Sequence, residues 1–166
     1  RAFDSVGGTP LFIEKAEGGF FNTVVLADPE GGIALHYRKR TLWSLGDADW
    51  AEEGDLGTPV AETPYGRIGV MICIDMHSTL RLLSEKNADI VLHVAAFYGP
   101  NFETYLLHKF VRKVRDADVH LVLANWSHPF APWWEGYGLT RIIYRGAKLY
   151  SRIKNDIGNG MVIADL

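Results

Sequence analysis

The sequence is poor in several features that mark particular classes of protein. A single cysteine, Cys73, among 166 residues excludes an internal disulfide framework and fits a reducing compartment such as the cytoplasm. The net charge of −3 gives no electrostatic reason to bind nucleic acid, and no apolar run is long enough to cross a bilayer. Neither a signal peptide nor a phosphate-binding glycine loop is present. These absences predict a cytoplasmic protein without nucleic-acid or membrane partners.

The composition is that of an ordinary globular domain, with 48% hydrophobic and 22% charged residues. The length predicts one domain over residues 1–166, or most of one. Because the chain begins with arginine rather than methionine, we expect an amino terminus that was processed, trimmed or cut from a longer chain.

Strand-like runs, turn signals and two helical segments alternate along the chain. A hairpin is predicted at residues 10–27, a strand at residues 33–37 and a polar loop at residues 44–58. The alternation of strands and helices that follows predicts an α/β fold with a mixed sheet. Its predicted elements are a strand at 67–72, a helix at 77–87, a strand at 89–96, a helix at 102–114, and strands at 120–124, 141–144, 148–153 and 161–164.

Cys73 lies where a predicted strand passes into a turn before a helix. Ligands in α/β folds collect at the carboxyl ends of strands. The dipole of a following helix can also lower the pKa of a thiol and make it nucleophilic. Alternatively, Cys73 is a small core residue, since free cysteine is among the most buried residue types. Its place at the strand end, close to Asp75, favours a chemical role.

A basic run, Arg38-Lys39-Arg40, follows another predicted strand. Such a run is commonly a solvated face, but three consecutive cations repel one another, so at least one is expected to have a partner. A lysine held over a thiolate stabilises it, and also stabilises the oxyanion formed when a carbonyl or nitrile carbon is attacked. Acyl transfer through a thiol needs a general base as well. The available carboxylates, none singled out by spacing, are Glu14, Asp47, Asp49, Glu52 and Glu53.

The remaining polar and aromatic signals are less specific. The six histidines show no metal-ligand spacing on one helix, so no metal site is predicted. His77 is close to Cys73 in sequence, but a place in the first helical turn can point it away. The aromatic segment 126–137 either lines a substrate pocket or forms a subunit interface. Trp126 and the neighbouring Asn125 are the candidate substrate-binding residues.

Several segments match, in the right order, those of one enzyme family. The most specific is Gly66-Arg67-Ile68-Gly69-Val70-Met71-Ile72-Cys73-Ile74-Asp75, which matches a nucleophile motif, and Tyr37-Arg38-Lys39 matches a lysine motif. Weaker matches are Phe21-Asn22-Thr23-Val24-Val25-Leu26, Asp28-Pro29-Glu30-Gly31, Asn87-Ala88-Asp89 and the passage 115–125. Over nearly its whole length the chain thus resembles the carbon–nitrogen hydrolase (nitrilase/amidase) family.

The resemblance implies a four-layer αββα sandwich of the nitrilase type and a Glu-Lys-Cys triad that needs no cofactor. By the same resemblance Cys73 is the nucleophile, Lys39 the cation on the oxyanion side, and the backbone N–H of Ile74 the second oxyanion donor. Members of the family act on amides, N-carbamoyl compounds or nitriles through a thioester-type intermediate. They usually dimerise, so a homodimer or higher oligomer is expected.

Departures from the family pattern bear on function. The catalytic glutamate of the family lies well upstream of the lysine, and the residues before Lys39 offer no counterpart, so we expect the sandwich to be incomplete at its amino-terminal side. A second family glutamate sometimes lies between lysine and cysteine, and Glu53 is the nearest candidate. Ser78-Thr79-Leu80 replaces the aromatic-Pro-Glu stretch that often follows the nucleophile motif, which leaves the substrate open.

The sequence therefore predicts an amidase-like hydrolase of non-peptide carbon–nitrogen bonds. Its substrate is expected to be an amide or N-carbamoyl compound, cleaved through a cysteine thioester acyl-enzyme. Nitrile hydrolysis is one alternative. A catalytically incomplete homologue that serves as a binding or assembly subunit is another, motivated by the base without a counterpart. Redox sensing at Cys73 is the third.

Overall fold

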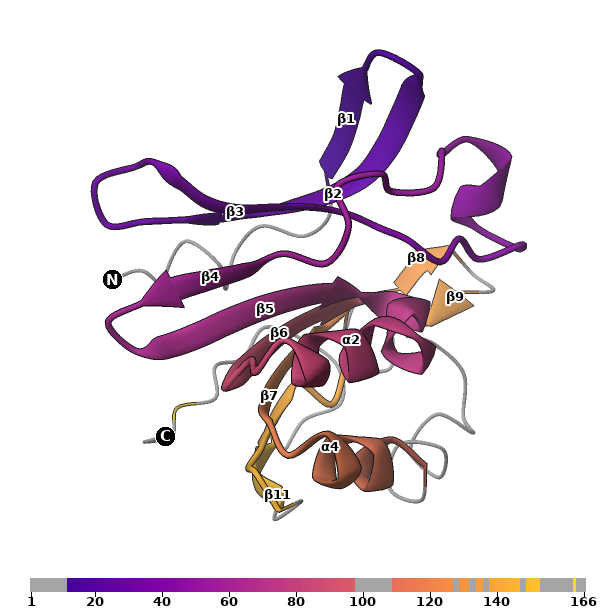
Figure 1. Cartoon of the computed structure of the whole chain (residues 1–166). Coiled ribbons are helices and arrows are strands. Elements are labelled where there is room, and N and C mark those ends of the chain that lie inside the picture. The colour runs from indigo at the N-terminus through magenta and orange to yellow at the C-terminus, as the bar shows by residue number, and fades with distance from the viewer. Residues whose placement is uncertain are drawn as a thin grey trace.

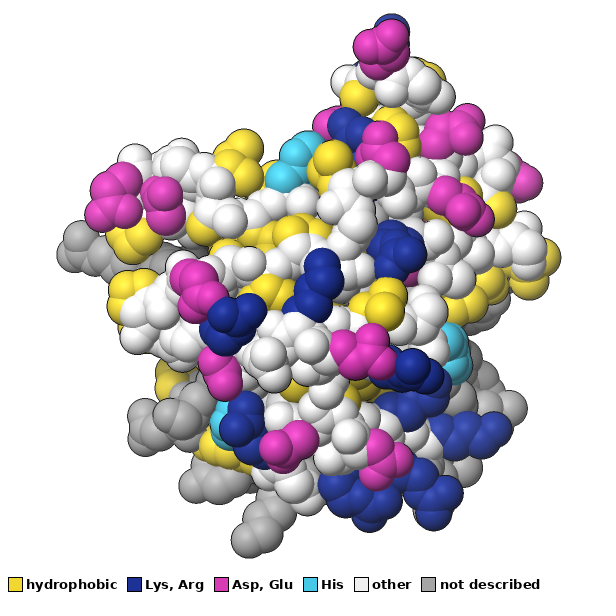
Figure 2. Space-filling view, viewed as in Figure 1, with side chains coloured by type: hydrophobic (Ala, Val, Ile, Leu, Met, Phe, Trp, Pro, Cys, Tyr) yellow, Lys and Arg dark blue, Asp and Glu magenta, His cyan; other side chains and the backbone are white. Residues whose placement is uncertain are grey.

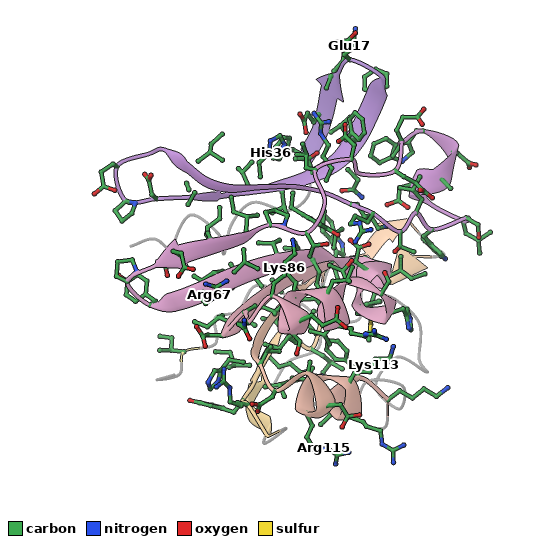
Figure 3. The ribbon with its side chains drawn as sticks, in the orientation of Figure 1. Glu17, His36, Arg67, Lys86, Lys113 and Arg115 are labelled. Carbon is green, nitrogen blue, oxygen red and sulfur yellow. The ribbon has the colours of Figure 1, made fainter. Side chains whose placement is uncertain are left out.

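Two β-sheets pack face to face, and helices cover the outer side of the larger sheet (Figure 1). The structure is a computed structural model that describes residues 12–97, 109–126, 129–131, 134–135, 138–146, 149–152 and 163. The smaller sheet is antiparallel, with its three strands in the order β1-β2-β3. Its strands are β1 (Phe12–Ala16), β2 (Gly19–Ala27) and β3 (Ile33–Arg38). The hairpin of β1 and β2, with Glu17 at its tip, projects away from the sandwich (Figure 3).

The larger sheet has six strands in the order β11-β10-β7-β6-β5-β4. They are β4 (Val60–Thr63), β5 (Gly66–Ile72), β6 (Ile90–Ala95), β7 (His120–Asn125), β10 (Arg141–Ile143) and β11 (Leu149–Arg152). The three central strands β5, β6 and β7 run parallel, and the outer strands pair antiparallel with their neighbours. The carboxyl ends of the parallel strands therefore meet at one edge, which is the edge where Cys73 follows β5. A separate small hairpin consists of β8 (Pro129–Ala131) and β9 (Trp134–Glu135).

The helices lie on the face of the larger sheet that points away from the smaller sheet (Figure 1). They are α2 (Thr79–Glu85) and α4 (Val111–Ala117), and two short 3-10 turns, η1 (Asp47–Asp49) and η2 (Cys73–His77), lie near the sheet edges. Strand β5 is buried on both faces: Ile68 and Val70 join the core between the sheets, and Met71 joins the core under the helices. This double burial explains why β5 reads as a continuous apolar run rather than an alternating one.

The predicted α/β fold with a mixed sheet is confirmed, with several differences in detail. The helix expected at 77–87 begins instead as η2 and continues as α2, and the second helix runs past its expected end to Ala117. Strand β4 was not predicted, because four residues carry too little periodicity. The strand expected at 161–164 and the start of the helix expected at 102–114 lie outside the described residues. In the described part of the chain, no helix is both long and apolar enough to span a membrane.

Helix α2 packs closely on β5 because one position of the strand has no side chain. A Cβ atom added to Gly69 would lie 2.5 Å from a methyl group of Leu83, which is fully buried. Since Leu83 lies in a packed core, it has little room to move aside. The distance between α2 and β5, and with it the place of the Cys73 turn that joins them, depends on this glycine.

We expect Gly69→Ala to lower the free energy of unfolding by about 1–3 kcal/mol, because an added methyl overpacks the core. Leu83→Ala alone should cost about 2–5 kcal/mol. The double variant should lose clearly less than the sum, because the shortened side chain makes room for the new methyl. Urea unfolding of the four proteins measures this. Strictly additive losses would mean that Gly69 and Leu83 do not oppose each other.

Candidate active site

Cys73 occupies a strained turn at the carboxyl end of β5. It is the first residue of η2, and its φ of 50° lies in the left-handed region that side chains other than glycine seldom adopt. Strain of this kind costs on the order of 1–3 kcal/mol and persists only where the surroundings enforce it. The turn is therefore held by other contacts, and the thiol is presented at the sheet edge.

His93 of β6 supplies one of these contacts. Its ring nitrogen Nε2 lies 2.9 Å from the backbone carbonyl oxygen of Cys73, to which it donates as a neutral imidazole. The ring is fully buried and lies against Phe97 and Phe110, with ring centroids 5.6 and 5.5 Å apart. Burial lowers the pKa of His93 to about 4, so the imidazole is uncharged at neutral pH. His93 thus fixes the backbone at Cys73 without adding charge there.

The Cys73 thiol is less acidic than an ordinary cysteine. Burial raises its pKa, and the positive charge of Lys39 and hydrogen bonds from the backbone of Ala96 and Ile74 offset this only in part. This corrects the expectation that a helix dipole lowers the pKa. The turn at Cys73 is a five-residue 3-10 helix, and α2 begins only at Thr79. The thiol therefore keeps its proton at neutral pH, and it could act as a nucleophile only after a base removes that proton.

Lys39 directly follows β3, and its backbone is held on both sides. Its N–H donates to the carbonyl of Asn22 at 2.8 Å, and its own carbonyl accepts from the N–H of Gly54, also at 2.8 Å. The loop passes so close at Gly54 that a Cβ there would lie 2.1 Å from the carbonyl oxygen of Arg38. The Lys39 side chain is only 3% exposed. The structure therefore turns this lysine inward, while its neighbour Arg38 pairs with carboxylates on the other face of the sheet.

Asp47 is the partner of the buried lysine. Its Oδ2 atom pairs with Lys39 Nζ and accepts from Asn22 Nδ2 at 2.9 Å, and its Oδ1 accepts from the backbone N–H of Trp43 at 2.6 Å. Burial acts to raise the pKa of Asp47, but the hydrogen bonds from Lys39, Trp43 and Asn22 together with the charge of Lys39 leave it below the ordinary value. Asp47 is therefore ionised at neutral pH, and both of its oxygens are engaged.

Cys73, Lys39 and Asp47 open onto one pocket of about 340 Å³. Ile74, whose N–H directly follows Cys73, also lines the pocket, and Trp43 and Phe97 supply apolar walls. A pocket of this size, mostly apolar with a few converging polar groups, is typical of a small-molecule site.

His77 lines the same pocket from the end of η2. Burial lowers its pKa, and so do the nearby charges of Lys113 and Lys109. Lys113 Nζ lies 3.4 Å from His77 Nδ1, and Figures 2 and 3 show the cationic side chains gathered over α4. His77 is therefore uncharged at neutral pH, and its place in the first helical turn does not point it away from the pocket.

The other predicted site residues lie elsewhere. Glu53 is exposed and is not part of the pocket lining. Asn125 lies behind the pocket: its side chain accepts from the N–H of Phe97 at 2.8 Å and donates to the carbonyl of Gly138 at 2.8 Å. The Trp126 side chain is 38% exposed and does not line the pocket either. The side chains of the aromatic segment beyond Trp126 lie outside the described residues.

The remaining candidate bases also lie away from the thiol. Glu14 is bound by Arg38, Thr23 and His36 on the outer face of the smaller sheet, and these hydrogen bonds, that of Arg38 foremost, lower its pKa to about 2. Asp49 and Glu52 are exposed. Among the described residues, no group of three or more His, Cys, Asp or Glu side chains is arranged to hold a metal ion.

Two polar residues of the pocket were not singled out from the sequence. Asp47 was one of five candidate carboxylates, and nothing local distinguishes it from Asp49. Asn22 carried a usable signal, because asparagine is disfavoured inside strands and its burial there requires specific hydrogen bonds.

Known proteins resemble the chain in sequence and in fold. A family model described as carbon–nitrogen hydrolase matches residues 5–135. An (R)-stereoselective amidase from a Pseudomonas species is 33% identical over 135 residues, covering 73% of this chain and 48% of that protein. A formamidase from Bradyrhizobium diazoefficiens is 32% identical over 111 residues, covering 65% of this chain and 32% of that protein. The chain thus spans half or less of the length of these relatives.

Solved structures agree on the fold. Nit3 of Saccharomyces cerevisiae, a member of branch 10 of the nitrilase superfamily, superposes with a TM-score of 0.75 at 21% identity, over 89% of this chain and 55% of that one. An amidase from a Nesterenkonia species superposes with a TM-score of 0.77 at 18% identity, over 86% of this chain and 55% of that one. Together with the family match over most of its residues, this places the chain in the carbon–nitrogen hydrolase family.

Proposed function

We propose that the protein hydrolyses a small amide or N-carbamoyl compound through a thioester on Cys73. The observation that carries the proposal is the buried pair of Lys39 and Asp47, which opens onto the same pocket as the thiol. Burying a charged lysine beside a cysteine is costly. A function that accounts for this cost is stabilisation, by the lysine, of an oxyanion formed when the cysteine attacks a carbonyl carbon. The relatives named amidase and formamidase support an amide over a nitrile.

The chemistry follows from the positions of the groups. Cys73 Sγ attacks the carbonyl carbon while a general base takes the thiol proton. Lys39 Nζ and the N–H of Ile74 donate to the oxyanion. The base passes its proton to the departing amine, which leaves a thioester. Water, deprotonated by the same base, then attacks the thioester and releases the carboxylic or carbamic acid and the thiol.

Asp47 is not the base in this scheme. It is the one carboxylate among the described residues that line the pocket, and Lys39, Asn22 and Trp43 already occupy its oxygens. We propose that the base is the glutamate that the family resemblance places well upstream of Lys39, which has no counterpart among residues 1–38. The homodimer or higher oligomer and the cytoplasmic location stay predictions.

Redox sensing is the weaker alternative. Sensor cysteines are typically exposed and of low pKa, whereas Cys73 is half-buried and burial raises its pKa. A non-catalytic assembly subunit would have no need for a buried cation beside the thiol.

Cys73→Ala should abolish ammonia release from small amides in the intact protein, because the acyl-enzyme can no longer form. A panel of formamide, propionamide, an N-carbamoyl amino acid and a simple nitrile would be assayed with the wild type and the variant, and circular dichroism would check the fold. Undiminished amide hydrolysis by Cys73→Ala would contradict the proposed function. Consumption of the nitrile alone would favour nitrile hydrolysis, and an inert wild type would favour the assembly subunit.

Asp47→Asn should lower kcat by about 10- to 100-fold, because Lys39 loses the carboxylate that orients it. The matched control is Asp49→Asn, which makes the same substitution two residues away in the same turn, on an exposed side chain. The control should keep the wild-type rate. Equal kcat values for the two variants would show that Asp47 does not contribute to catalysis.

The pH dependence of Cys73 alkylation tests the electrostatics without turnover. Iodoacetamide reacts with the thiolate, so the rate should rise with a midpoint above that of free cysteine, because burial raises the pKa of Cys73. Lys39→Met should move the midpoint higher still, since removing a nearby cation disfavours the thiolate. Lys86→Met, which removes a lysine bound to the carbonyl of Thr58, is the control and should leave the midpoint unchanged. Peptide mass spectrometry assigns the modified residue.

A further inference from the structure

Asp75 is a fully buried carboxylate that the proposed chemistry leaves unused. It lies two residues after Cys73, in the same 3-10 turn, and does not line the pocket. Burial raises its pKa, and the donors around it and the charge of Lys39 counteract this only in part. A carboxyl group is expensive to bury, so its contacts call for an explanation.

Three donors from two distant segments converge on this carboxylate. Its Oδ2 atom accepts from the Tyr37 hydroxyl at 2.7 Å and from the N–H of Ile72 at 3.2 Å. Its Oδ1 atom accepts from the N–H of Thr41 at 2.8 Å. A carboxylate accepts all three at once, whereas an amide in its place would turn a donating NH₂ group toward at least one of them.

The donors bracket the two reacting residues. Tyr37 and Thr41 stand two residues before and two residues after Lys39, and Ile72 immediately precedes Cys73. The hydroxyls of Thr41 and Ser78 add a second contact between the same segments, 3.0 Å apart. The carboxylate of Asp75 therefore ties the backbone on both sides of the lysine to the turn that carries the nucleophile.

We propose that Asp75 is a positioning residue, which sets the place of Lys39 relative to Cys73 by hydrogen bonding the segments that carry both. The inference rests on the proposed function in one respect, namely that Lys39 acts on the thiol. Asp75 itself touches neither the substrate nor the reacting atoms. Its effect passes through the position of the ammonium group.

The direction of the effect separates positioning from direct electrostatics. Neutralising a carboxylate near the thiol would, by its charge alone, favour the thiolate and lower the pKa of Cys73. Releasing Lys39 from its position would disfavour the thiolate and raise the pKa of Cys73. The two mechanisms thus predict opposite shifts for Asp75→Asn, and a purely structural role predicts lower stability with no shift.

The test is the pH profile of Cys73 alkylation by iodoacetamide in the intact protein. Asp75→Asn should move the midpoint upward and slow alkylation several-fold at neutral pH. Tyr37→Phe keeps the carboxylate and removes one of its hydrogen bonds, so it should shift the midpoint in the same direction by a smaller amount. The matched control is Asp89→Asn, a carboxylate that accepts from the N–H of Arg67 at 2.9 Å near the other end of β5. This control should leave the midpoint where it is.

The decisive comparison repeats Asp75→Asn in a Lys39→Met background. If Asp75 acts through Lys39, the upward shift should vanish there, because no cation remains to be misplaced. In turnover, Asp75→Asn should lower kcat by at least about tenfold with little change in KM, since small misplacements at a reacting centre are costly.

Three outcomes would overturn the inference: an unchanged midpoint, a lowered midpoint, or an equal upward shift with and without Lys39. Should Asp75→Asn fail to fold, Tyr37→Phe in both backgrounds carries the same test. If Lys39→Met itself leaves the midpoint unchanged, the proposed function fails first and the inference falls with it. If Lys39→Met moves the midpoint and Asp75→Asn does not, the inference alone fails.

Discussion

The site depends on the burial of one ion pair, Lys39 with Asp47. Removing two charges from water costs several kcal/mol for each ion, and their attraction repays this only where the geometry is good and the remaining hydrogen-bonding positions are filled. The loop after Lys39 turns back so that Asp47 reaches the lysine. The N–H of Trp43 and the side chain of Asn22 donate the remaining hydrogen bonds to the Asp47 carboxylate. The close approach of the loop at Gly54 also stabilises the ion pair, because the N–H of Gly54 holds the backbone of Lys39 in place.

Cys73 is held in place by different means. Around Cys73 the fixing contacts are neutral: an uncharged His93 on the carbonyl, and the backbone of Ala96 and Ile74 on the thiol. The site thus separates two tasks. In the proposed mechanism, Lys39 of the ion pair supplies the positive charge that an oxyanion needs, and the turn supplies a defined position for a thiol that keeps its proton until a base removes it. Asp75 lies between the two, hydrogen bonded to both segments.

Much of this was readable from the sequence, because the signals were local. The apolar run before Cys73 predicted a buried strand, and the alternation around it predicted the mixed sheet. Two features were not readable. Which loop carboxylate meets Lys39 depends on how the chain folds back after Trp43, so that Asp47 lies in the pocket while Glu53, six residues on, is exposed. The acidity of the thiol depends on desolvation, which only the packed structure determines and which outweighs the charge of Lys39 and the backbone hydrogen bonds of Ala96 and Ile74.

The hydrogen bond from His93 to the carbonyl of Cys73 has a consequence for which residues can replace this histidine. At this position of β6 the turn requires one hydrogen-bond donor directed at the carbonyl oxygen of Cys73. The imidazole of His93, uncharged at neutral pH, contributes that hydrogen bond and no charge. Any side chain that can donate from the same point satisfies the requirement. We therefore expect this position to tolerate replacement of histidine by another donor of similar reach, with the geometry of the Cys73 turn unchanged.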